Sequence, residues 1–95
     1  MAPIEQRLVF TVHGPIERDD LRGLCVRVGA LLEGSGADVA YCEVGTVAPD
    51  AVTVDALARL QLAARRFGCR VHLRDASPDL QALVDFMGLS DVLPE

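Results

Sequence analysis

The chain has 95 residues, a hydrophobic fraction of 51% and a formal net charge of −5. This length suits one domain with one core, and the hydrophobic fraction excludes an intrinsically disordered chain. The basic residues are all arginines, and there is no tryptophan. A nucleic-acid-binding surface would favour a basic patch with stacking rings. We therefore expect a single domain over residues 1–95 with no nucleic-acid partner.

The sequence also bears on membrane association and localisation. No apolar run approaches the length that a transmembrane helix requires. The segment "MAPIEQRLVF" lacks the basic leader of a secretory signal, and its apolar part is typical of a strand. We expect a cytoplasmic protein without direct membrane insertion.

The first half of the chain predicts a strand, a helix and a second strand. Residues 8–13 alternate in the manner of a strand, and the acids of "IERDD" suit a helix N-terminus. Residues 38–44 form a second short run rich in strand formers. Between them, apolar residues recur at helical spacing until "GSG" at residues 34–36: Leu21, Leu24, Cys25, Val28, Leu31 and Leu32.

The second half repeats this order of helix and strand. A second helix is expected to end near Gly68, and residues 70–74 alternate cleanly as a third strand. Ser77 then suits an N-cap and Pro78 a first helical position, with Gly88 ending the third helix. The tail "LSDVLPE" predicts a turn or a short edge strand. The expected buried residues of these two helices are Leu57, Leu60, Ala64 and Phe67, then Leu80, Leu83, Val84 and Met87.

The element order β-α-β-α-β-α predicts a small α/β domain. The connections are long enough for a mainly parallel or mixed sheet. Arg70, His72 and Arg74 make alternate positions of the third strand polar, so we expect the helices to cover chiefly one face of the sheet. This arrangement argues against a doubly wound dinucleotide fold, as does the lack of a GxGxxG or P-loop motif.

The residues capable of covalent or metal chemistry do not form a recognisable site. Cys25, Cys42 and Cys69 have no CxxC spacing and lie in apolar patterns. His13 and His72 lack a neighbouring cluster of carboxylates or cysteines. We expect no catalytic residue, no metal and no cofactor. An enzyme that uses Cys42 with a histidine is the least favoured alternative.

The stretch "PDAVTVDALARL", residues 49–60, begins the second helix. Thr53 can cap a helix whose first turn holds Asp55, and Asp50 can cap it one turn earlier. Arg59 stands four residues after Asp55, which predicts an ion pair within the helix. Taken alone, this stretch is an ordinary helix start.

The chain resembles a STAS domain, the fold of bacterial anti-sigma-factor antagonists. The similarity runs from about Leu8 to Leu93 and is strongest in "LARLQLAARRFGCRVHLRDASPDLQALVDFMGLSDVL". This segment has the family's order of helix, Gly turn, strand, "SP" cap, helix and closing "GL..V". The chain departs from the family in having only "MAPIEQ" before the first clear strand, so we expect the family's extra N-terminal strand to be absent.

The resemblance also implies a phosphorylation switch, which this chain departs from. Family members that act as switches open this helix with an Asp-Ser-Ser-Gly-Leu type of motif, whose first serine is phosphorylated. Aligned on Leu57 and Leu60, that serine falls on Val54, which has no hydroxyl. Thr53 could be phosphorylated only if the register of the loop shifts, and Asp55 carries less charge than a phosphoserine. We expect this switch to be lost.

By resemblance, we expect a non-enzymatic regulatory module that binds a kinase-type anti-sigma factor. The docking surface would comprise the loop 45–52 and the start of the second helix, with Thr53, Val54 and Asp55 at its centre and Asp50 and Arg59 at its rim. The alternatives are a regulatory subunit of a lipid-transport ABC system and a domain that binds a nucleotide or lipid.

Overall fold

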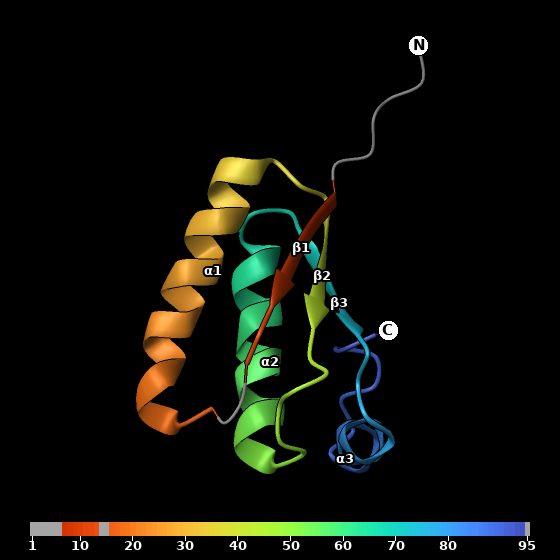
Figure 1. Ribbon diagram of the computed structural model, residues 1–95. Coiled ribbons are helices and arrows are strands. Elements are labelled where there is room, and N and C mark those ends of the chain that lie inside the picture. The colour runs from red at the N-terminus through yellow and green to blue at the C-terminus, as the bar shows by residue number, and fades with distance from the viewer. Residues whose placement is uncertain (1–6, 14–15, 95) are drawn as a thin grey trace.

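The computed structural model describes residues 7–13 and 16–94. It confirms the predicted order β-α-β-α-β-α and adds a short 3₁₀ turn before the first helix (Figure 1). The elements are β1 (Arg7–Thr11), η1 (Arg18–Asp20), α1 (Leu21–Ser35), β2 (Val39–Glu43), α2 (Ala51–Arg65), β3 (Arg70–Arg74) and α3 (Pro78–Phe86).

The three strands form a parallel sheet in the order β1-β2-β3. Tyr41, at the centre of β2, lies between Val9 of β1 and His72 of β3 in this register. Helices α1 and α2 make the two crossovers and stand side by side on one side of the sheet, whereas α3 lies below β3 (Figure 1). Because the strands lie in chain order and such crossovers are right-handed, both crossover helices lie on the same face.

The two faces of the sheet differ in burial. Ala40 and Cys42 of β2, with Val71 and Leu73 of β3, are at most 4% exposed and face the helices. On the opposite face, Thr11, Arg70 and Arg74 are exposed, and Tyr41, Glu43 and His72 are half-buried. The prediction that the helices cover chiefly one face, made from the polar alternation of β3, is confirmed.

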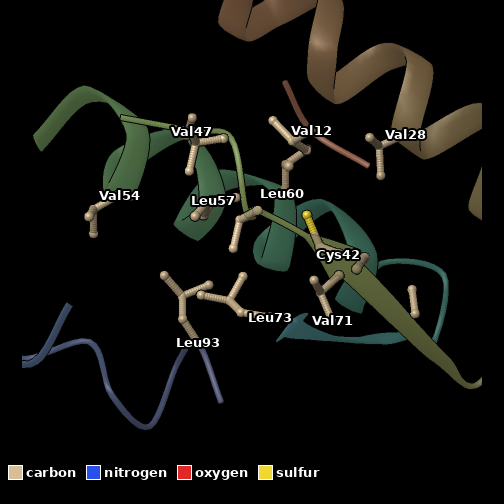
Figure 2. Close-up of a cluster of buried hydrophobic side chains, with 14 of the residues drawn as sticks. Val12, Val28, Cys42, Val47, Val54, Leu57, Leu60, Val71, Leu73 and Leu93 are labelled. Atoms are coloured by element: carbon tan, nitrogen blue, oxygen red, sulfur yellow. The ribbon is translucent and has the colours of Figure 1, made fainter. Parts of the chain in front are cut away.

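The core is centred on the buried side of α2. Val54, Leu57 and Leu60 of this helix are fully buried there (Figure 2). Leu93 of the C-terminal tail closes the core beside Leu73 (Figure 2). Nearly all the buried apolar side chains of the described residues therefore belong to one hydrophobic cluster. Within the described ranges, no helix is both long enough and apolar enough to cross a bilayer.

Local capping signals set the start of α3 and the ends of α2 and α3, as the sequence predicts. The Ser77 hydroxyl accepts a hydrogen bond of 3.1 Å from the Leu80 N–H, and Pro78 is the first residue of α3. Gly68 and Gly88 follow α2 and α3 with φ angles of +70° and +74°, a conformation that costs a glycine little.

Three apolar residues expected in the core are partly exposed instead. Phe67 lies beyond the last residue of α2 and is 43% exposed, and Met87, at the C-cap of α3, is 39% exposed. Leu31 of α1 is 50% exposed. The first two differences have one cause: Phe67 and Met87 continue the apolar periodicity of helices that end before them.

The tail after α3 forms turns, and it reaches the outer edge of β3. The Leu73 N–H donates to the Pro94 carbonyl at 2.8 Å. Of the two predicted forms, turn and edge strand, the structure has the turn. The predicted absence of a strand before Leu8 concerns residues 1–6, which lie outside the described residues.

Candidate functional site: the start of α2 and the groove between α1 and α2

Asp50 is the N-cap of α2. Its extended backbone (φ −125°, ψ 167°) precedes the helix, and its carboxylate accepts a hydrogen bond of 2.8 Å from the Thr53 N–H. This interaction satisfies one of the helix's free N–H groups. Of the two predicted caps, Asp50 therefore fills the role, and Thr53 is inside the first turn.

Capping at Asp50 decides which residues of this turn reach the surface. Thr53 and Val54 become the third and fourth residues of the helix, on the same side as the buried Leu57, and both are 0% exposed. Figure 2 shows Val54 among the core side chains. Their expected place at the centre of an exposed docking surface is therefore wrong. A kinase could reach the Thr53 hydroxyl only after the first turn of α2 opened.

Asp55 and Arg59 lie on the outer side of the same helix. The Arg59 Nε donates to the Asp55 carboxylate at 3.0 Å, and the side chain of Arg59 is 59% and that of Asp55 49% exposed. The predicted ion pair within the helix is confirmed. Such an exposed pair adds little to stability, so it leaves both charges available to other groups.

A groove of about 1140 Å³ runs between α1 and α2, and Asp55 and Arg59 line it. Arg22, Cys25 and Val26 of α1 lie along it as well. Val26 is 66% exposed, so the groove presents apolar surface as well as charge. The groove brings two of the predicted residues together with side chains of α1 that sequence reasoning did not select.

Gly29 and Phe67 shape the end of the groove near the C-termini of the two helices. A Cβ at Gly29 would be 3.6 Å from the ring of Phe67, so the ring lies directly over this glycine. Both residues line the groove. The signal that could have revealed the groove is Val26, an apolar residue of α1 outside the buried stripe.

The groove is basic, although the chain is acidic. Arg18, Arg22, Arg59 and Arg66 line it, against the two acids Glu33 and Asp55, an excess of two positive charges. α1 and α2 point the same way, so their N-termini lie at the same end of the groove (Figure 1). The partial positive charge of two helix N-termini adds to that of the arginines there.

The open face of the sheet carries a second group of polar side chains. The Arg74 guanidinium lies 4.5 Å from the centre of the Tyr41 ring and 3.9 Å from the Glu43 carboxylate. The Tyr41 and His72 rings are neighbours, with centres 5.9 Å apart. Glu43 also accepts a hydrogen bond of 3.3 Å from Thr11. These groups largely satisfy one another, and the face combines half-buried rings with the exposed Arg70 and Arg74.

Cys42 and Cys69 are in environments that suppress thiolate chemistry. Burial, with a smaller contribution from Glu43, raises the pKa of Cys42 to about 12. Burial also raises the pKa of Cys69. Cys42 points to the buried face of the sheet, whereas His72 stands on the open face. These two residues therefore cannot form a nucleophile–base pair. Among residues 7–13 and 16–94, no group of three His, Cys, Asp or Glu side chains could hold a metal ion.

Comparison with known proteins gives no assignment. No protein-family model matches the chain, and no curated protein sequence matches it. The similarity to STAS domains therefore stays a prediction from the sequence pattern.

Proposed function

We propose that the chain is a non-enzymatic, cytoplasmic interaction module of the STAS type that binds a partner protein at the groove between α1 and α2. One observation supports this proposal above the others. The exposed Asp55–Arg59 pair lies beside the exposed apolar side chains of Val26 and Phe67 in a single groove. A central apolar contact with charges around it is the usual composition of a protein-binding surface.

The resemblance to anti-sigma-factor antagonists makes a kinase-type anti-sigma factor the first partner to test. The contact surface would include Asp55, Arg59 and the adjoining N-cap Asp50. Thr53 and Val54 would contribute indirectly, because their buried side chains hold the first turn of α2 in place. Because the Thr53 hydroxyl is fully buried, we propose that binding is not controlled by phosphorylation of this turn.

A binding experiment with purified proteins tests the proposal. The partners would be kinase-type anti-sigma factors from the source cell and, for the alternative role in lipid transport, the ATPase and permease subunits of its lipid-transport ABC system. Binding would be measured by calorimetry for the wild type, Asp55→Lys and Asp91→Lys. Asp91 is an exposed aspartate of the tail, outside the groove, so its substitution makes the same change of charge.

We expect Asp55→Lys to weaken binding about tenfold or more and Asp91→Lys to leave it unchanged, since only the former reverses a charge in the contact. Equal binding by all three proteins would place the contact elsewhere. Binding to none of the partners would remove both named roles. Binding of the transport subunits alone would favour the alternative role in lipid transport.

The open face of the sheet supports a second candidate function, the binding of a small anionic ligand such as a nucleotide or a lipid headgroup. Arg74 offers an exposed cation beside the half-buried rings of Tyr41 and His72. Titration with ATP and with a short-chain phospholipid, followed by NMR, would test it. Chemical-shift changes confined to these residues, and lost in Arg74→Ala, would support it, and unchanged spectra would contradict it.

A further inference from the structure

The outer side of α3 exposes a stripe of apolar and acidic side chains. Phe86 is 89% exposed, the highest value among the exposed large hydrophobic residues of the described chain, and Met87 beside it is 39% exposed. Asp79, Ala82 and Phe86 follow one another at spacings of three and four residues, so they share one exposed side of the helix. An aromatic side chain this exposed loses much contact with water when it docks into a groove.

The surroundings of this stripe are acidic. Residues 75–94 include Asp75, Asp79, Asp85 and Asp91 and contain no arginine, lysine or histidine. Asp85, next to Phe86, accepts a hydrogen bond from the Ser90 hydroxyl. α3 is therefore a short amphipathic helix whose exposed side combines an aromatic anchor with negative charge.

The groove between α1 and α2 has the complementary properties. It offers the exposed Val26 and Phe67 with an excess of two positive charges, from four arginines and two acids. The helix is nine residues long, or about 13 Å, and the groove extends along α1 from Arg22 to Glu33, which is about 16 Å. In size, apolar character and charge, the groove therefore matches the outer side of α3.

We propose that α3 of one copy of this chain docks into the groove between α1 and α2 of a second copy. The contact cannot form within one chain, because α3 lies on the far side of α2 from α1 (Figure 1). Each copy then has one donor surface and one acceptor surface. Such a heterologous contact builds rings or open chains of molecules and does not close as a symmetric dimer.

This inference shares the groove with the proposed function and would make self-association compete with partner binding. It rests on that function only for this regulatory consequence. The self-association itself is measured on the purified chain with no partner present. A chain that does not self-associate could still bind its partner, and a chain that binds no partner could still self-associate.

The first test is sedimentation velocity over a range of protein concentrations, with three variants beside the wild type. We expect the wild type to associate reversibly. Phe86→Ala and Val26→Glu should each weaken association about 30-fold, the effect of losing or blocking a central anchor. Leu62→Ala is the matched control, since Leu62 of α2 is 59% exposed but lies outside the groove.

Mixing the two weakened variants distinguishes this contact from any other. Phe86→Ala keeps an intact groove, and Val26→Glu keeps an intact α3. Together they should form a 1:1 complex that does not grow further, at concentrations at which neither variant associates alone. Circular dichroism would verify that each variant is folded, as expected for substitutions at exposed positions.

Salt provides the remaining test. Association should be stronger in about 0.05 M than in about 0.5 M NaCl, because salt screens attraction between the arginines and aspartates. A wild type that is monomeric at all concentrations would overturn the proposal. Equal weakening by Leu62→Ala, association that resists salt, or a mixture that forms no complex would each overturn it as well.

Discussion

The side-chain amide of Gln61 hydrogen-bonds to both backbone groups of Val71. Its Oε1 accepts from the Val71 N–H and its Nε2 donates to the Val71 carbonyl, each at 2.8 Å. The same Nε2 donates to the Val92 carbonyl at 2.8 Å. One buried side chain of α2 therefore occupies the outer edge of β3 as a neighbouring strand would, and it holds the tail against that edge.

Replacing Gln61 by leucine should lower the free energy of unfolding by about 2–4 kcal/mol, because buried N–H and C=O groups of the backbone lose their partners. Gln81→Leu is the control. Gln81 makes a single exposed bond to the Ala76 carbonyl, so its replacement should cost less than about 1 kcal/mol. Urea unfolding measures both. Equal losses in the two variants would show that the Val71 groups find other partners.

The N-cap of α2 allows a second substitution test. Asp50→Ala removes the acceptor of the Thr53 N–H and should cost about 1 kcal/mol. Asp50→Asn keeps an acceptor at the same place without the charge and should remain close to the wild type. Thermal unfolding of the three proteins checks this. A loss in Asp50→Asn as large as in Asp50→Ala would assign the effect to charge and not to the hydrogen bond.

The order of elements could be predicted from the sequence because each depends on local signals. The alternation in β3 and the Ser77-Pro78 start of α3 are readable within a few residues, and both are confirmed. The positions at which the helices end could be predicted less accurately. Phe67 fits the periodicity of α2, yet the helix ends before it, and a periodic pattern carries no information on that point.

The candidate site could be predicted only in part, for a similar reason. Asp55 and Arg59 form a local pair that their spacing reveals. Whether Thr53 or Asp50 caps the helix decides the burial of Thr53 and Val54, and the sequence allows either. The groove also needs α1, which reaches Arg59 only through tertiary packing. Val26 is a local signal of apolar surface on α1, but no spacing within one helix could indicate that α2 forms the other wall of the groove.

Ionisation of the Cys42 thiol makes the free energy of unfolding depend on pH in the alkaline range. Burial raises the pKa of its thiol to about 12, from an ordinary value of 9.0. Above pH 9 the unfolded chain loses this proton while the folded chain keeps it. The unfolded state then binds fewer protons, so the free energy of unfolding falls as the pH rises from about 9 toward 12.

Urea unfolding between about pH 8 and pH 10.5 measures this decline. Cys42→Ala is the comparison. It should be less stable at pH 8, because a buried side chain is shortened, but its stability should decline less steeply with pH. The same slope in both proteins would show that other groups, among them Cys69, account for the effect.

Thr53 combines complete burial with an unpaired hydroxyl. Its Oγ1 has no hydrogen-bond partner among the described residues, whereas its backbone N–H is bound to Asp50. Thr53→Val has nearly the same shape, removes only the unpaired polar atom and keeps the backbone bond. It should therefore raise the free energy of unfolding by about 1–2 kcal/mol.

Thr46→Val, at an exposed loop position, is the control and should change the free energy of unfolding by less than about 0.5 kcal/mol. If urea unfolding shows that Thr53→Val destabilises the chain, the hydroxyl has a partner in solution, such as a buried water.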